Sequence, residues 1–326
     1  MTVKPAATRF VPTREQYAWT FGGCEPVMRI QPGEILDLYT EDAFAGQIRS
    51  SDDLPSRSIT YPFINPQTGP FHVEGAEPGD TLAIHLIDVQ PARDWGVSTT
   101  VPLFGALTST KFTPTRDRRV VTYSALDSVP RTELPLEPFL GTVGVAPAAG
   151  EARNVLVPEA FGGIMDTPEA RAGTTIYLGV NVEGALFSIG DGHYTMGEGE
   201  VCGVAVEGSM DTLLTVDLVK GVYCEWPRLE DDDTIMVAGS YRPLEDAFRI
   251  AHTQLVRWIA EATGLSVLDA YQLVTQGSRS PIANVCDANY TIVAKIPKRY
   301  LPDVDWMGGT HRRLRGIATA TRDPQG

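Results

Sequence analysis

The sequence predicts a mainly β protein, with sandwich- or barrel-like β domains and a small α+β unit near the C-terminus. Short apolar or alternating segments, separated by frequent turns, fill the first two thirds of the chain, as is typical of sandwiches and barrels. The 31 glycines and 24 prolines are spread along the sequence, so turns are many and elements short. Apolar residues at helical spacing appear only in the last third.

Strands are expected where apolar residues alternate or cluster between turn signals. Residues 81–90 alternate through Leu82, Ile84 and Leu86, and residues 174–182 alternate in the same way, which is the pattern of a half-buried strand. Further strands are expected at residues 27–30, 35–39, 120–123, 214–218 and 290–296.

Two helices are expected near the C-terminus. Apolar side chains recur at helical spacing over about residues 243–262, and Gly264 follows as a stop signal. Ser266, with Asp269 three residues later, caps a second helix over about 267–275. The apolar stripe should pack on the β body and bury Trp258.

These patterns divide the chain into five predicted parts. They are an N-terminal arm (1–17), a β-sandwich domain (18–150), a second β portion (151–235), an α+β unit (236–302) and a polar C-terminal tail (303–326).

Composition excludes several classes of partner. The formal net charge of −14 argues against nucleic acid and anionic membrane surfaces, which are bound by basic patches. The sequence has neither an apolar segment of membrane-spanning length nor the apolar core of a signal peptide at its N-terminus. Four widely spaced cysteines without a C-x-x-C pair predict reduced thiols in a cytoplasmic protein, with Cys202 packed in the core.

Residues 184–207 carry the clearest candidate chemistry. His193 occurs there with Asp191, Glu198 and Glu200 among several glycines, and apolar segments at 185–189 and 201–206 are expected to be buried strands flanking a loop. Because side chains two residues apart in an extended backbone point to the same side, Asp191 and His193 can converge on one metal ion. The alternative is a hairpin whose acidic tip is merely solvated.

Other candidate residues lie at strand ends. Asp42 and Glu74 each follow a strand beside a glycine and could reach a shared cleft, and Asp166 ends a second glycine-rich loop. His85 and His252 are expected to be structural. The common signatures of serine nucleophiles and of H-E-x-x-H zinc enzymes are absent.

Several segments together resemble the acetamidase/formamidase family, over about residues 18–302. They are Asp42-Ala-Phe-Ala-Gly-Gln-Ile48, Asn65-Pro-Gln-Thr-Gly-Pro70, Val73-Glu-Gly-Ala-Glu-Pro-Gly-Asp80, Gly162-Gly-Ile-Met-Asp166, Gly184-Ala-Leu-Phe-Ser-Ile-Gly-Asp-Gly-His193, Gly197-Glu-Gly-Glu200, Asp269-Ala-Tyr271 and Pro297-Lys298.

The resemblance implies an amidohydrolase that cleaves the C–N bond of small linear amides to a carboxylate and ammonia. It also implies assistance by a divalent metal, with zinc expected. The metal-and-carboxylate frame comprises Asp42, Asp166, Asp191, His193 and Glu200.

Within this frame, Asp42, Asp191 and His193 are the expected metal ligands. Glu74, Glu200 and Asp166 are the expected catalytic acids, with Glu74 or Glu200 carrying the proton from water to the leaving nitrogen. Sequence alone does not separate ligand from base.

Two alternatives remain open at this stage. One is a hydrolase of a lactam or other cyclic amide on the same frame, and the other is a non-catalytic homologue that binds a small molecule. The expected partner is therefore a small-molecule amide, and a homodimer is expected because dimers are the commonest assembly.

Two departures from the family pattern predict the substrate preference. Ile164 and Met196 stand where the family usually has Asn and Gln. An apolar pocket gains about 0.8 kcal/mol per buried methylene, so two or three methylenes outweigh one neutral hydrogen bond, worth about 0.5–1.5 kcal/mol. We expect a higher kcat/KM for butyramide or a γ-lactam than for formamide. A tenfold preference for formamide would show that these two side chains do not face the substrate.

Overall fold

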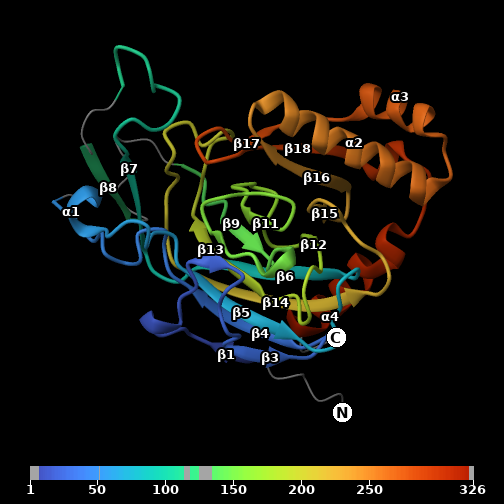
Figure 1. Ribbon diagram of the computed structural model, residues 1–326, viewed down its shortest axis with the longest axis horizontal. Helices are drawn as coiled ribbons and strands as arrows, with labels where there is room; N and C mark the ends of the chain where they lie inside the picture. The colour runs from blue at the N-terminus through green and yellow to red at the C-terminus, as the bar shows by residue number, and fades with distance from the viewer. Residues whose placement is uncertain (1–6, 51, 114–117, 125–133, 323–326) are drawn as a thin grey trace.

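Two β-sheets packed face to face form the body of the protein, and helices cover the outer face of the larger sheet (Figure 1). The computed structural model describes residues 7–50, 52–113, 118–124 and 134–322. Both sheets are open within these residues, with edges at separate strands. The mainly β prediction is confirmed, and the arrangement is the sandwich rather than the barrel.

The larger sheet has nine strands in the order β1-β4-β14-β6-β12-β15-β16-β18-β17. Its long central strand β6 carries Leu82 and Ile84 toward the other sheet, while Ala83 between them faces the helices, as period-2 alternation requires. The strands are β1 (Thr8–Phe10), β4 (Ile35–Thr40), β14 (Met210–Val219), β6 (Thr81–Pro91), β12 (Thr175–Gly179), β15 (Arg228–Glu230), β16 (Thr234–Tyr241), β18 (Tyr290–Pro297) and β17 (Ile282–Asn284).

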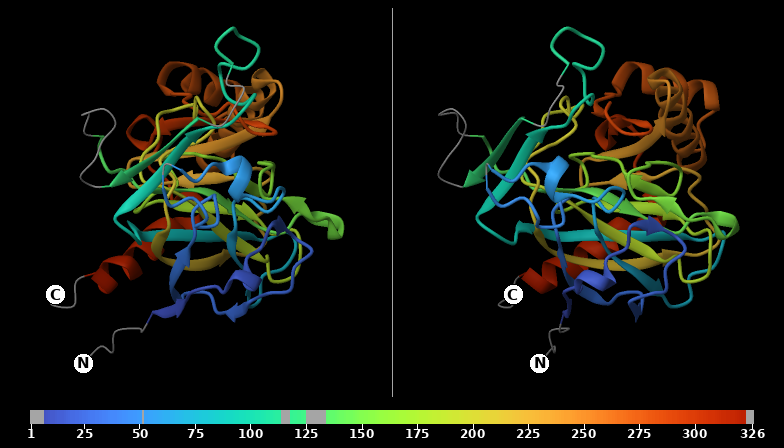
Figure 2. Two further views of the ribbon diagram at one scale, coloured as in Figure 1. Left: turned by 90° about the vertical axis from the view of Figure 1, so that its left-hand side faces the viewer. Right: turned by 60° about the vertical axis from the view of Figure 1, so that its left-hand side comes forward.

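The smaller sheet has five strands in the order β11-β9-β13-β5-β3. They are β11 (Gly162–Ile164), β9 (Phe139–Gly144), β13 (Phe187–His193), β5 (Gln67–Val73) and β3 (Met28–Ile30). Two short pairs complete the β structure, β2 (Thr20–Phe21) with β10 (Arg153–Asn154) and β7 (Trp95–Thr100) with β8 (Arg118–Ser124). The β7–β8 pair projects from the body (Figure 2).

Helices α2 (Leu244–Thr263) and α3 (Val267–Gly277) confirm the two predicted helices. Gly264 ends α2 in a left-handed conformation, and Ser266 accepts a hydrogen bond from the backbone N–H of Asp269 at the start of α3. The apolar stripe of α2 packs on β16 and β18. The shorter helical segments are α1 (Pro55–Ser58), η1 (Arg14–Gln16), η2 (Ala148–Gly150), η3 (Lys298–Tyr300) and η4 (Trp306–Gly309).

The sequence predicted a polar tail from residue 303 onward. The structure instead places residues 306–309 and helix α4 (Thr310–Arg322) against the large sheet. Leu314 is fully buried, and α4 contacts β6 and β14. His85 and His311 both approach the hydroxyl of Thr175, each with an Nδ1–Oγ1 distance of 2.9 Å. The stretch looked polar because only one face of a short helix needs apolar residues.

The sheets run across the predicted domain boundaries. Strand β6, from the predicted 18–150 domain, pairs with β12 and β14 from the 151–235 portion. Strand β1 lies in the predicted N-terminal arm and pairs in parallel with β4. No helix of the described residues is long and apolar enough to cross a membrane.

Trp258 anchors α2 to the remainder of the helical layer. Its side chain is 2% exposed, meets Trp306 edge-on at 5.6 Å between ring centroids, and lies beneath the guanidinium of Arg228. We expect Trp258→Ala to lower the free energy of unfolding by about 3–5 kcal/mol, the usual cost of truncating a buried aromatic residue. Phe248→Ala, on the exposed side of the same helix, should cost less than about 1 kcal/mol. Urea unfolding measures the loss of unfolding free energy in both variants. Equal losses would show that Trp258 is not packed in the core.

Candidate active site

Five carboxylates and one imidazole converge at one buried site. The group consists of Asp166, Asp191, His193, Glu200, Glu207 and Asp287, each 9% exposed or less. Carboxylates are rarely buried without a cationic partner, and the ion pairs of these five within the described residues involve only His193. We call these six residues the acid cluster.

Strand β13 supplies Asp191 and His193, which share one face as predicted. The register with β9 pairs Gly190 with Thr142 and Gly192 with Leu140, so Gly141 lies opposite Asp191. The expected strand–loop–strand arrangement was wrong in two respects. The D-x-H triplet lies in the strand itself, and residues 201–206 form no strand.

Asp166 reaches the cluster through the turn after β11. The backbone N–H groups of Met165 and Asp166 both donate to the carbonyl of Gly141, at 2.9 and 3.0 Å. Asn284 donates from Nδ2 to the Asp166 carboxylate at 3.2 Å. These bonds fix Asp166 beside Asp191.

Glu200, Cys286 and Asp287 meet because two loops are joined by backbone hydrogen bonds. The N–H of Gly199 donates to Ala283, and the N–H of Val285 donates back to Gly199. Glu207 arrives separately, through bridges that its backbone makes with Val97 and His193. The cluster is therefore assembled from segments that are far apart in the sequence.

Three of the acids have left-handed backbone conformations. The φ angles of Asp166, Asp191 and Glu200 are 47°, 61° and 44°. This region is uncommon for residues other than glycine and costs free energy. Rigid surroundings must hold these residues in place.

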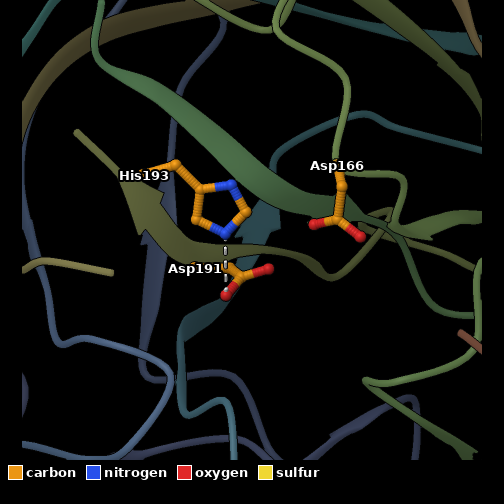
Figure 3. A group of neighbouring side chains, drawn as sticks. All are labelled: Asp166, Asp191 and His193. Carbon is orange, nitrogen blue, oxygen red and sulfur yellow. Dashed lines mark ion pairs between the residues drawn. The ribbon is translucent and has the colours of Figure 1, made fainter. Parts of the chain in front are cut away.

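The donor atoms fall into three groups of three, each with all its atoms within 4.8 Å of one another. The groups are Asp166, Asp191 and His193 (Figure 3), then His193, Glu200 and Glu207, then Glu200, Cys286 and Asp287. The Nε2 atom of His193 lies 3.5 Å from Asp191 Oδ1 and 3.2 Å from Glu207 Oε2.

Crowding shifts the protonation of the cluster. Burial and the neighbouring carboxylate of Glu200 raise the pKa of Asp166 well above its ordinary value. Burial likewise raises the pKa of Glu200 to about 8 and that of Asp287 to about 7. Burial opposes the charged form of His193, but Glu207 and Asp191 outweigh it and raise the pKa of the imidazole. The cluster thus has more negative charge than its own groups can neutralise.

Buried atoms without a partner show what the cluster lacks. Asp166 Oδ1, Asp287 Oδ2 and His193 Nδ1 have no hydrogen bond, although buried polar atoms are nearly always bonded. A Cβ on Gly141 would lie 2.5 Å from Asp191 Oδ2 and 2.6 Å from Asp166 Oδ1, so glycine leaves open the space between these donors. Oxygen and imidazole donors around such a space fit a divalent cation.

A hydrogen-bonded chain of neutral side chains orients Asp191. The hydroxyl of Thr142 donates to Asp191 Oδ2, Asn65 Nδ2 donates to that hydroxyl, and Gln67 donates to Asn65 Oδ1, at 3.0, 3.0 and 2.8 Å. All three side chains are buried. Such outer partners fix the orientation of metal ligands.

Two of the residues expected in the site lie outside the acid cluster. The buried carboxylate of Asp42 pairs with Arg93 and accepts the N–H groups of Phe44 and Gly46, so its oxygens are already engaged. Glu74 binds Arg29 at 2.6 Å, with its side chain 33% exposed. Gln67, at the start of β5, pairs with Gly190 next to Asp191. Glu74 follows the other end of β5, so at about 3.3 Å per residue it lies roughly 20 Å from the cluster.

Sequence reasoning missed Glu207, Asp287 and Cys286. The only available signal for Glu207 was its place at the end of the glycine-rich stretch, and Asp287 follows a short strand without any motif. Cys202, expected in the core, is exposed in a turn.

A cavity of about 730 Å³ lies away from the cluster, between η3 and α4. Three of its basic side chains are ion-paired, Lys298 with Glu230, Arg312 with Asp305 and Arg315 with Asp232, and Arg299 lies over the ring of Tyr300. We therefore place the chemistry in the acid cluster, where donors converge and lack partners.

Comparison with known proteins identifies the family and the fold of the chain. The model of the Acetamidase/Formamidase family matches residues 19–154 and 148–272. A solved acetamidase from Yersinia enterocolitica is 35% identical, with a TM-score of 0.86 over 93% of this chain and 95% of that chain. One from Bacillus halodurans is 29% identical, with a TM-score of 0.81 over 90% and 98% of the two chains.

A curated acetamidase from Mycolicibacterium smegmatis is 25% identical over 59% of this chain and 63% of its own length. The chain spans about three-fifths of the length of the curated relatives it matches.

The space at Gly141 gives a direct test of the cluster. The methyl group of Gly141→Ala would press on Asp191 and Asp166, whereas the backbone of Gly141 is not left-handed and tolerates alanine. We expect divalent-metal affinity to fall by about 100-fold or more, since even changes in outer partners cost about 10–100-fold. Gly197→Ala is the matched control, because its Cβ meets nothing within 4 Å. Metal titration with near-UV circular dichroism compares the two, and unchanged affinity in a folded Gly141→Ala protein would contradict the site.

Proposed function

Because the chain belongs to the acetamidase/formamidase family, we propose that it hydrolyses the C–N bond of small linear amides to a carboxylate and ammonia. The observation that supports this most is the convergence of Asp166, Asp191 and His193 on one open space in the sandwich. An amide carbonyl is a poor electrophile, so the reaction needs an activated water and a stabilised oxyanion.

We propose that Asp166, Asp191 and His193 hold a divalent metal ion, and that this ion is zinc. Zinc accepts imidazole nitrogen and carboxylate oxygen as ligands, and catalytic zinc sites use three protein ligands and keep a further position open. Such an ion, when bound, polarises a carbonyl and lowers the pKa of water to about 7.

Glu200 and Glu207 remain to carry the proton from water to the leaving nitrogen. Both have a donor atom within 4.8 Å of His193 and of each other. The other oxygen of Glu207 accepts the N–H of Ala205 at 2.9 Å, which fixes the side chain and leaves Oε2 directed at His193. A carboxylate fixed beside the reacting atoms typically contributes about 10²–10⁴-fold in rate.

The surrounding residues set the geometry and exclude bulk water. Phe139 stacks edge-on against His193, with ring centroids 4.8 Å apart, and Thr142 holds Asp191 as described. Because the cluster is 9% exposed or less at every residue, charge interactions inside it are weakly screened.

We also propose a homodimer located in the cytoplasm. All four cysteines are free, as suits a reducing compartment. Leu103, Leu107 and Phe112, on the loop that follows β7, are exposed apolar side chains, and such patches commonly mark contact surfaces. Light scattering on purified protein measures the assembly state.

Ammonia release tests the proposed activity. The panel comprises formamide, acetamide and butyramide, with and without a chelator, and a γ-lactam whose ring opening is followed instead by the new primary amine of the amino acid product, because it releases no ammonia. We expect release from at least one linear amide, loss after chelation and recovery with zinc. Glu207→Gln should keep the metal while kcat falls by about 10²–10⁴. His252→Ala is the control, because this histidine lies on α2 and contacts Phe248 and Ser280.

Three results would contradict the proposal. They are full activity in protein shown by elemental analysis to lack metal, a Glu207→Gln variant as fast as wild type, and a metal-loaded protein that releases ammonia from none of the linear amides. The last result, with tight binding of an amide, would favour the non-catalytic alternative, and turnover of the lactam alone would favour the cyclic-amide alternative.

A further inference from the structure

The thiol of Cys286 lies against the acid cluster and has no part in the proposed reaction. Cys286 follows strand β17 and is 5% exposed, and its Sγ donates to Glu200 Oε2 at 3.1 Å. Burial and the carboxylate of Glu200 raise the pKa of this thiol. Free cysteine commonly packs as a small buried hydrophobe, whereas this thiol lies beside carboxylates.

Glu200, Cys286 and Asp287 form a donor group of their own. Their ligand atoms all lie within 4.8 Å of one another, and none of the three residues belongs to the group of Asp166, Asp191 and His193. Metal–ligand bonds are about 2.0–2.6 Å long, so donors around one ion lie at most about 4–5 Å apart. The spacing of the three donors therefore fits a single ion.

An independent observation points to a missing ligand at this group. Asp287 Oδ2 is buried and has no hydrogen-bond partner, in a residue that is 9% exposed. The nearby Arg242 donates to the backbone carbonyl of Asp287 and not to its carboxylate. A cation in the group would supply the partner that the carboxylate lacks.

The charge of the whole cluster exceeds what one ion can offset. Five carboxylates and one imidazole converge, so one divalent cation leaves most of the negative charge in place. With all five carboxylates ionised, two divalent cations reduce the net charge from −5 to −1, or to −2 once the thiol of Cys286 has lost its proton. Burial of unneutralised charge is costly, and this favours a second cation.

We propose that Glu200, Cys286 and Asp287 form a second metal subsite, next to the one proposed for Asp166, Asp191 and His193, and that it binds a thiophilic divalent cation. This inference rests on the proposed function and deepens it. A thiolate among carboxylates favours zinc or cobalt over calcium or magnesium. On binding, the S–H bond gives up its proton to solvent and sulfur donates to the metal.

The second subsite also separates the roles of the two glutamates. Glu200 becomes a metal ligand in this group, whereas Glu207 lies outside it. Glu207 then carries the proton in the reaction by itself.

Cobalt substitution tests the subsite through sulfur, independently of activity. Protein stripped of metal is titrated with Co²⁺, and absorption and bound metal are measured together. We expect two ions per chain in wild type and a near-ultraviolet band from sulfur-to-cobalt charge transfer. Cys286→Ser should abolish the band and weaken the second ion at least tenfold. Cys24→Ser, which changes a half-buried thiol near Thr20, should retain both.

Asp287→Asn provides a second variant, because it keeps the thiol and removes one carboxylate. It should weaken the second ion at least tenfold while the first still binds. The inference is overturned if wild type binds one ion without a sulfur band, or if the band survives Cys286→Ser. In either case metal-dependent ammonia release would leave the proposed function standing, whereas full activity without metal, an unimpaired Glu207→Gln variant or no release from any linear amide would contradict that function itself.

Discussion

Mutual repulsion among buried carboxylates is the constraint on which the site depends. In a flexible structure, five buried carboxylates with one imidazole would move apart or become protonated. Here three of the acids are held by hydrogen bonds to groups that are not acids. Gly141 accepts from the turn that carries Asp166, Ala205 donates to Glu207, and Thr142 donates to Asp191. The left-handed backbone at Asp166, Asp191 and Glu200 shows that surrounding structure opposes the local preference of the chain.

The stability that offsets this cost lies largely elsewhere. Two extended hydrophobic clusters surround the large sheet, one shared with the small sheet and one shared with the helices. The helical cluster includes Trp258, Trp306 and Leu314 and lies on the far face of the large sheet from the sandwich interior. Apolar burial of this extent can tolerate a strained polar centre.

The predictions that rested on regular apolar periodicity were confirmed. The alternation over residues 81–90 and the helical stripe over 243–262 became β6 and α2, because both depend on one buried face. Asp191 and His193 of the D-x-H triplet also lie together, with His193 Nε2 3.5 Å from Asp191 Oδ1, although the left-handed backbone at Asp191 departs from regular alternation. Where function depended on long-range pairing, local patterns failed. Glu74 and Asp42 had suitable neighbours in sequence, but Arg29 and Arg93 engage them. Glu207 and Asp287 enter through loops whose partners are set by tertiary contacts alone.

The donors come from both sheets, which makes the cluster a cross-link within the sandwich. Strands β9, β11 and β13 of the small sheet position Asp166, Asp191 and His193. Strand β17, at the edge of the large sheet, leads to Asn284, Cys286 and Asp287. Asn284 already bridges the two through its bond to Asp166. Any cation held between these halves must bind the folded arrangement and not the unfolded chain, so it adds to the free energy of unfolding by mass action. The carboxylates that repel one another without a cation would each attract a bound one, and that attraction would hold the two sheets together.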